Sequence, residues 1–522
     1  MVANVTGVVY YAIAARLLPS VADFGRIATF QMICLLFITL SSFVLPSAIV
    51  KLMAEYNGGG RHDDTRGLYG LALRLGGVFA LASFTICFLA ADPIASYLLG
   101  GPEYTDLVRL LSIDVLLLVL VPYMTGLLQG QQRFGTMALL GSSNAILRHA
   151  IAVLALYVGL GLQGVIIGWV VGDLSQAVLS FLLVFRGSGT RMEIGMVSHP
   201  IRPMIKYSTP LYVSAVITFF IHQTDKFLIL FLAGQEALGL YSPAVTAMSV
   251  LLLFSNAFTN VLFPQLSERC GRLGIQSLKE ISRTFSKYVY LVYTPLAFGI
   301  AAVARPIMIV FVGERFIGGA LPLAILSLSS ALACGSVITN SVLLATGKTG
   351  IFSLVGILSV VADIVFAFLL IGPLGPVGAA IARSSVVLVQ FIVPTVVLTK
   401  TLGQHLDLKS CAKSIVASSV SALAVLGVQA MSPSTSLLPL LAAVVVGGLV
   451  YLVMLRVLKA LGRGDFMLLG SLLPKRTKKL VKVAETILIG NQAQQDTENE
   501  EDTDIRQQAE TSEPSPPPHA TV

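Results

Sequence analysis

Long apolar runs alternate with short polar segments along almost the whole chain. Most runs are about 20 residues long, which is the length a helix needs to cross the hydrocarbon core of a bilayer. The pattern therefore predicts fourteen membrane-spanning helices. They are expected at residues 2–18, 27–50, 68–90, 107–128, 137–158, 165–185, 208–232, 239–263, 288–311, 320–345, 351–371, 377–399, 412–430 and 437–458.

Composition agrees with this interpretation. The 522 residues are 55% hydrophobic and 12% charged, with a mean hydropathy of +0.84, whereas a soluble protein is about a quarter charged. The net charge is +8, and the basic residues are concentrated in alternate loops. Basic loops mark the cytoplasmic side of a membrane protein. We expect an all-α polytopic protein of the cell membrane with both termini in the cytoplasm. Nothing indicates a nucleic-acid partner.

The chain contains two related halves. The segment ARLLPSVADFGRIATF (15–30) aligns with LFLAGQEALGLYSPAV (230–245), and GLQGVIIG (161–168) aligns with GPVGAAIA (375–382). The offset stays near 215 residues, so two six-helix lobes should repeat in parallel. The predicted units are an N-terminal lobe (1–186), a cytoplasmic linker (187–206), a C-terminal lobe (207–400), two extra helices (401–460), a basic amphipathic segment (461–490) and a disordered acidic tail (491–522).

No sequence motif indicates an enzyme. GLGLQG (159–164) satisfies the dinucleotide pattern GxGxxG, but it joins two apolar helices and follows no strand, so we interpret it as a tight turn. The five cysteines are scattered, without the spacing of a metal site or a disulfide framework. We expect no catalytic residues, no cofactor and no metal.

Ionisable residues inside the apolar runs are the candidate functional residues, because a charge in a membrane span is costly. Asp225 and Lys226 lie well inside span 208–232, with His222 on the same helix face. They form either a structural pair or part of a cavity lining. Arg148 and Asp363 lie 215 residues apart at equivalent repeat positions, and one hypothesis pairs them across the lobes. Asp225, His222 and Asp363 are candidates for ion coupling or gating.

Several motifs resemble those of the polysaccharide-exporter flippases of the multidrug/oligosaccharidyl-lipid/polysaccharide superfamily. They are ARLLP…FG near the first helix, TDKFLILFLAG…ALGLYSPA…LFPQLSE in the second lobe, and LLATGKTG at 343–350. The resemblance covers about residues 8–460. It implies a V-shaped, two-lobed fold like that of multidrug and toxin extrusion (MATE) transporters, with a central cavity that opens alternately to each side. It also implies transport of polyprenyl-phosphate or -pyrophosphate sugars from the inner to the outer leaflet.

An anionic head group needs cations along its path, and arginine and lysine bind phosphate in different ways. The candidates are Lys226, Arg148 and Arg383, with Arg16 and Arg26 toward the outer mouth. The expected partners are the lipid-linked glycan, membrane lipids and glycan-assembly machinery. No nucleotide motif is present, so the energy would come from an ion gradient, the membrane potential or the sugar gradient.

Two other functions stay open. A drug or cation antiporter of the same superfamily would need carboxylates in the cavity, and Asp225 and Asp363 fit that need. A non-transporting scaffold of a glycan-synthesis complex is the third possibility.

Overall fold

The computed structural model describes residues 2–186, 201–431, 437–462 and Asp465. All regular structure in these ranges is helical, which confirms the predicted fold class. The α-helices are α1 (Val2–Leu17), α2 (Val21–Ser41), α3 (Leu45–Gly58), α4 (His62–Leu89), α5 (Ala91–Ile94), α6 (Thr105–Gly130), α7 (Phe134–Tyr157), α8 (Gly161–Arg186), α9 (Ile201–Leu273), α10 (Leu278–Ala302), α11 (Ala304–Phe311), α12 (Ala320–Leu332), α13 (Ser336–Ala345), α14 (Thr349–Leu374), α15 (Pro376–Leu402), α16 (Leu408–Met431) and α17 (Leu437–Val457).

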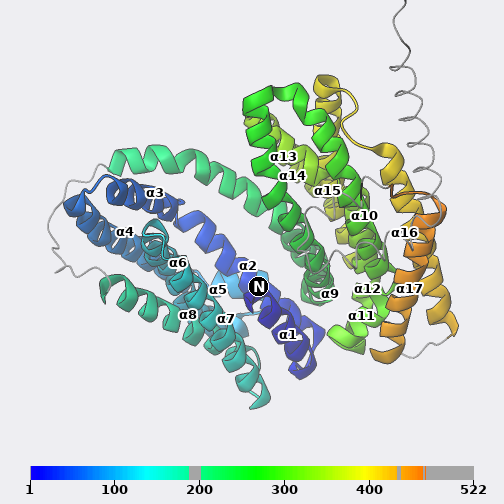
Figure 1. Cartoon of the computed structure of the whole chain (residues 1–522). Helices are drawn as coiled ribbons and strands as arrows, with labels where there is room; N and C mark the ends of the chain where they lie inside the picture. Colours follow the sequence, from blue (N-terminus) through cyan, green and yellow to red (C-terminus); the bar gives the residue numbers. More distant parts are fainter. Residues whose placement is uncertain (1, 187–200, 432–436, 463–464, 466–522) are drawn as a thin grey trace, which may run out of the picture.

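The helices form two lobes (Figure 1). Helices α1 to α8 lie on the left of the view and α10 to α15 on the right, with α16 and α17 along the outer side of the second lobe. Helix α7 packs along α8, and α14 packs along α15, at equivalent places of the predicted repeat. The lobe boundaries stay predictions. The predicted tail 491–522 and most of the predicted linker and amphipathic segment lie outside the described residues.

The number of membrane spans is not confirmed. Within the described residues, eleven helices are long and apolar enough to cross a membrane, or twelve if α10 and α11, bent by 72°, form one span. Helix α9 counts once there, although it contains the two predicted spans 208–232 and 239–263. The apolar part of α1, Val5–Leu17, is shorter than a full crossing.

Helix α9 connects the two lobes. It begins at Ile201, inside the predicted linker, and reverses direction at Gly234, whose φ of 80° is readily adopted only by glycine. Its first turns pack on the N-terminal lobe, where the hydroxyls of Ser208 and Tyr212 donate to the carbonyls of Val44 (3.4 Å) and Leu40 (3.3 Å). Further along, its residues enter the core of the C-terminal lobe.

We call the end of the molecule that carries the turns after α1 and at Gly234 the outer end, following the predicted topology. There the lobes are in direct contact. Arg16 Nη2 donates to the carbonyl of Val310 at 2.5 Å, and Arg315 Nη1 donates to that of Pro19 at 3.1 Å. The structure therefore has its outer end closed.

Glycines let α2 and α9 approach closely at the outer end. A β-carbon on Gly25 would overlap the carbonyl of Gln235, and one on Gly239 would overlap the carbonyl of Val21. Small residues allow helix backbones to pack together in membranes, where no hydrophobic effect drives helices together. The cross-lobe seal thus depends on these two positions having no side chain.

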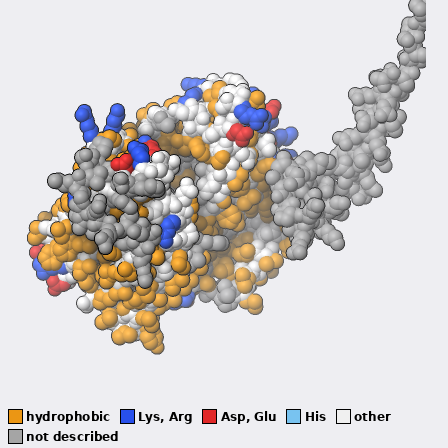
Figure 2. All heavy atoms as spheres, turned by 60° about the vertical axis from the view of Figure 1, so that its left-hand side comes forward, with side chains coloured by type: hydrophobic (Ala, Val, Ile, Leu, Met, Phe, Trp, Pro, Cys, Tyr) orange, Lys and Arg blue, Asp and Glu red, His pale blue; other side chains and the backbone are white. Residues whose placement is uncertain are grey.

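Basic and apolar surfaces are unevenly distributed (Figure 2). Most of the visible Lys and Arg side chains lie toward the upper end of the view, and apolar side chains cover much of the lower flank. The upper end lies opposite the outer end. A basic end of this kind matches the predicted cytoplasmic side.

We expect Gly25→Ala to lower the thermal stability of the detergent-purified protein, because the added methyl group forces α2 and α9 apart. Overpacking of this kind costs about 1–3 kcal/mol. Gly77→Ala on α4 is the control, since a β-carbon there meets nothing within 4 Å, and alanine is the better helix former by up to about 1 kcal/mol. Equal melting temperatures of Gly25→Ala and the unchanged protein would contradict the packing described here.

Candidate functional site

Three charged side chains meet inside the N-terminal lobe, and we call them the N-lobe cluster: Asp114 of α6, Arg148 of α7 and Asp173 of α8. Arg148 Nη1 lies 2.5 Å from Asp173 Oδ2, and its Nη2 lies 3.6 Å from Asp114 Oδ2. The Asp114 side chain is fully buried and that of Arg148 is 17% exposed. Arg148 is thus held between two carboxylates of its own lobe.

The sequence of α8 explains why these groups meet. Gly164, Gly168 and Gly172 recur every fourth residue and form one face of the helix. A β-carbon on Gly168 would overlap Ala152 of α7, and one on Gly172 would overlap Arg148. The helices therefore pack at short range, which brings Asp173 against α7.

Other groups complete the N-lobe cluster. Asn144 Nδ2 donates to Asp173 Oδ1 at 2.7 Å, and the Arg148 guanidinium lies 4.6 Å from the ring centre of Trp169. The Cys34 thiol is 3.8 Å from Asp114 Oδ2. Within the described residues, Asp114 Oδ1 is buried and has no hydrogen-bond partner.

A second group of charges, the C-lobe cluster, comprises His222, Asp225, Asp363 and Arg383 from α9, α14 and α15. The Tyr241 hydroxyl donates to Asp225 Oδ2 at 2.6 Å, joining the two arms of α9. Arg383 donates to the Ile221 carbonyl and, at 3.0 Å, to His222 Nδ1. Asp363 is fully buried and lies within electrostatic range of Asp225 and Arg383. Neither of its carboxylate oxygens has a hydrogen-bond partner among the described residues.

Lys226 differs from the other cations. Its side chain is half-buried, and within the described residues its ammonium forms neither a hydrogen bond nor an ion pair within 4 Å. The neighbouring Asp225 accepts from the Lys226 backbone N–H at 2.9 Å and otherwise from Tyr241. The adjacent acid and base do not pair with each other through their side chains.

The structure places Arg16 and Arg26 at the outer end. Arg16 is exposed and bonded to Val310 of the opposite lobe. Arg26 pairs with Asp23 at 2.7 Å and lies 4.3 Å from the ring centre of Tyr104, so its charge is shared within its own lobe.

The hypothetical ion pair between Arg148 and Asp363 does not form in this conformation, because Arg148 forms ion pairs with Asp173 and Asp114 instead. No sequence pattern singles out Asn144, Trp169 or Tyr241, because their roles depend on which helices pack together. One signal was available: the glycine spacing of α8 marks the face that contacts α7. Within the described ranges, no group of three or more His, Cys, Asp or Glu could hold a metal ion.

Two helical lobes in contact at one end, each with a cluster of charged side chains among its apolar helices, are the architecture of a multi-pass membrane protein built from a repeated unit. The sequence pattern of the polysaccharide biosynthesis protein family matches residues 13–319, more than half of the chain, and the chain belongs to this family. The resemblance inferred from the motifs is therefore confirmed.

Two curated relatives are similar in sequence. The probable low-salt glycan biosynthesis flippase Agl15 of Haloferax volcanii is 27% identical over 254 residues, or 48% of this chain and 53% of the relative. The lipid II flippase MurJ of Bacillus subtilis is 25% identical over 111 residues, 20% of each chain. The matches thus span about half and a fifth of these relatives.

Solved structures share the fold. The lipid II flippase MurJ in an inward closed conformation superposes with a TM-score of 0.64 at 12% identity, over 84% of this chain and 97% of that one. An inward-facing MATE family multidrug transporter of the MOP superfamily also superposes with a TM-score of 0.64. The two chains are 13% identical, and the match covers 75% of this chain and 94% of the transporter. The chain is a multi-pass membrane protein with the MurJ and MATE fold.

We expect Arg148→Met to destabilise the protein by about 3–5 kcal/mol, because it leaves Asp173 and Asp114 buried without their cation. Arg109→Met is the matched control, since the Arg109 side chain is 44% exposed and pairs with an exposed Asp106. Surface pairs of this kind contribute about 0–1 kcal/mol. Urea unfolding followed by fluorescence measures both. Similar losses in the two variants would show that the N-lobe cluster does not stabilise the lobe.

Proposed function

We propose that this protein is a flippase that moves lipid-linked oligosaccharide or polysaccharide precursors across the cell membrane by alternating access. The family and the two flippases among its relatives support this substrate class. The protein would act as a transporter without catalysis, with both termini in the cytoplasm. Glycan-assembly enzymes would supply the lipid-linked sugar.

Lys226 is the observation that carries the proposal. It lies inside a predicted span, on the helix that contacts both lobes, and its ammonium has no hydrogen bond and no ion pair within 4 Å among the described residues, although the Asp225 carboxylate is in electrostatic range. A half-buried cation among apolar helices costs free energy unless an anion compensates it. The phosphate groups of a polyprenyl-linked sugar are anions of this kind. Arg148 and Arg383, already bonded within their lobes, would add positive potential around the head group.

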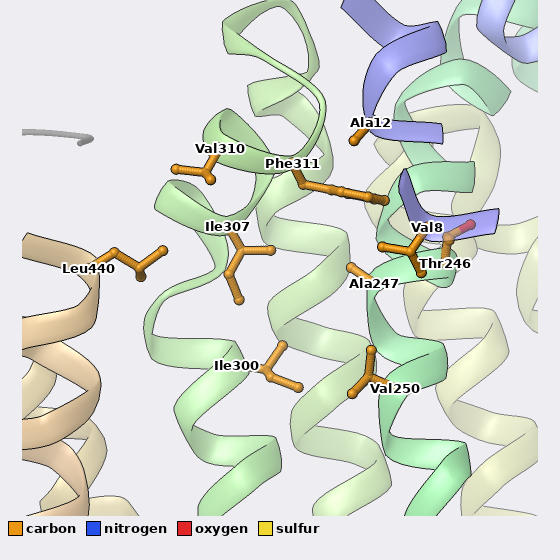
Figure 3. Close-up of a pocket in the computed structure, with 10 residues that line it drawn as sticks. All are labelled: Val8, Ala12, Thr246, Ala247, Val250, Ile300, Ile307, Val310, Phe311 and Leu440. Carbon is orange, nitrogen blue, oxygen red and sulfur yellow. The ribbon is translucent and has the colours of Figure 1, made fainter. Parts of the chain in front are cut away.

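The lipid tail would occupy an apolar pocket (Figure 3). A pocket of about 450 Å³ lies between α1, the second arm of α9, α11 and α17, with Val8, Val250, Ile307 and Leu440 among its lining side chains. A second hollow of about 380 Å³ continues from it between α10, α16 and α17. Its lining shares Ile307 and Leu440 with the first. An isoprenoid chain would follow this path while the sugar occupies the space between the lobes.

The closed outer end fits the start of the cycle. Head-group entry from the inner side would be followed by separation of the lobes at the outer end, which breaks the bond between Arg16 and the Val310 carbonyl. The freed guanidinium would then meet the phosphate on its way out. Arg26 could contribute to the same exit potential.

The antiporter alternative requires a carboxylate that can receive a cationic drug. Asp225 already accepts from Tyr241, and Asp363 is fully buried within range of the Arg383 cation. A transported cation would also have to approach Lys226. The geometry therefore favours an anionic head group, and Asp225, His222 and Asp363 remain candidates for coupling or gating.

We expect Lys226→Met to reduce flipping about 10- to 100-fold, the effect of losing one charge-assisted contact worth about 1.5–3 kcal/mol. The assay uses proteoliposomes with a fluorescent polyprenyl-pyrophosphate N-acetylhexosamine, and dithionite reports the outer-leaflet fraction. Lys226→Arg should retain part of the activity, and Arg109→Met should retain all of it. The proposal fails if Lys226→Met flips at the unchanged rate. Transport of ethidium in place of the lipid, abolished by Asp225→Asn, would establish the antiporter.

We expect Ile307→Trp to weaken binding of geranylgeranyl pyrophosphate about tenfold or more, because the indole fills the apolar pocket and displaces part of the chain, at about 0.8 kcal/mol per CH₂. Inorganic pyrophosphate has no tail and should bind both proteins alike. Leu154→Trp on the exposed flank of α7 is the control, with its side chain 63% exposed. Thermal stabilisation by each ligand is the measurement. Unchanged isoprenoid affinity would place the tail elsewhere.

A further inference from the structure

We propose that the N-lobe cluster is a proton-binding site, and that the proton is carried on the Asp114 carboxylate. The proposed function assigns Arg148 to the head-group path but gives no role to Asp114. The proposal deepens that function and rests on it for the use of the proton in transport.

The charge balance of the cluster is the first observation. Two carboxylates, Asp114 and Asp173, face one guanidinium, that of Arg148. If all three groups are ionised, the cluster has one net negative charge among the apolar helices α6, α7 and α8. An uncompensated charge in a low-dielectric interior is strongly unfavourable. One bound positive charge makes the cluster neutral.

The position of the missing charge is the second observation. Asp173 is satisfied on both oxygens, by Arg148 and by Asn144. Asp114 has the longer contact of its Oδ2 to Arg148, at 3.6 Å, the weak donor Cys34, and the neighbouring Asp173 carboxylate, which cannot donate to it while both are ionised. Its Oδ1 is buried without a partner among the described residues. The least satisfied oxygen of the cluster is therefore Asp114 Oδ1.

A proton fits this position better than a metal ion. The guanidinium of Arg148 lies beside the carboxylate and would repel a metal cation, whereas a proton forms a covalent O–H bond and removes the negative charge. The surroundings also lack the ligands that a metal requires, since no group of three His, Cys, Asp or Glu in the described ranges could hold one. A sodium or calcium ion would need about six oxygen ligands.

The charged and titratable groups around Asp114 come from the helices packed on α6. Cys34 faces it from α2, Arg148 from α7 and Asp173 from α8, while Cys87 of α4 lies beside Cys34. Arg148 is the most exposed member of the cluster, so the proton would enter at this side chain. A hydronium ion there transfers its proton to Asp114 and leaves a water molecule, with no other bond broken.

Proton uptake changes what Arg148 offers to a ligand. With Asp114 ionised, the guanidinium is attracted by two carboxylates, and the cluster repels an anionic head group. With Asp114 neutral, only Asp173 holds Arg148, and the negative charge that opposed phosphate is gone. Proton binding and head-group binding thus favour each other at this site, and by linkage each raises the affinity for the other.

The fluorescence of a tryptophan beside the N-lobe cluster can report protonation of this site. Trp169 is the only tryptophan in the sequence, and the Arg148 guanidinium lies 4.6 Å from its ring centre. Movement of Arg148 or a change in the nearby charge alters the emission of the indole. The test is a titration of intrinsic tryptophan fluorescence over about pH 4 to 9, the range in which a perturbed carboxyl group titrates. It uses the full chain in detergent, without substrate.

We expect a single sigmoidal transition in the unchanged protein, its loss in Asp114→Asn, and its return at a shifted midpoint in Asp114→Glu. The variants Asp225→Asn and Asp363→Asn alter the other lobe and should keep the transition. Thermal melting checks that Asp114→Asn is folded. If Asp114→Asn does not fold, the shifted midpoint in Asp114→Glu tests the proposal independently.

Absence of a transition in the unchanged protein, or its persistence in Asp114→Asn, would overturn the proposal. So would a transition that disappears when sodium chloride is replaced by choline chloride, because the site would then bind a metal cation. No glycan lipid enters the experiment, so its failure is separate from failure of the flippase assignment.

Discussion

The constraint on which this structure depends is that a charge inside the hydrocarbon region must be compensated by other polar groups. The protein satisfies it differently in its two lobes. In the first lobe Arg148 is held by two carboxylates and an aromatic ring. In the second lobe, Asp225 accepts a hydrogen bond from Tyr241, and Arg383 donates to His222 and to the Ile221 carbonyl. The Lys226 ammonium has no hydrogen bond among the described residues. The least compensated groups, Lys226 and Asp114, are those to which we assign ligands.

Close helix packing makes this compensation possible. The glycines of α8 bring Asp173 against α7, and Gly25 and Gly239 bring α2 against α9. In membranes, helices associate through van der Waals packing and polar contacts, so small residues decide where backbones approach. Close helix packing at glycines therefore both brings the N-lobe cluster together and closes the outer end.

The two lobes have different roles in the proposed cycle. In the proposed cycle, Lys226 of the C-terminal lobe binds a phosphate, and the apolar pocket beside α1 and α11 takes the isoprenoid chain. The N-terminal lobe holds the cluster that we propose to bind one proton. Helix α9, which carries Lys226, packs on both lobes. In the proposed cycle, the binding of an anion and of a proton would act on one movement of the lobes.

The sequence by itself determined the fold class, the two-fold repeat and the family, because hydrophobic length and repeated motifs are local properties of the chain. It also located Lys226, Arg148 and Asp363 as charges in spans. Only the tertiary structure decided their partners: Arg148 binds Asp173 and Asp114, and not Asp363. The reason is physical. Whether a buried charge is compensated depends on which helix faces it at a distance of a few ångströms, and the sequence of one helix does not specify its neighbour.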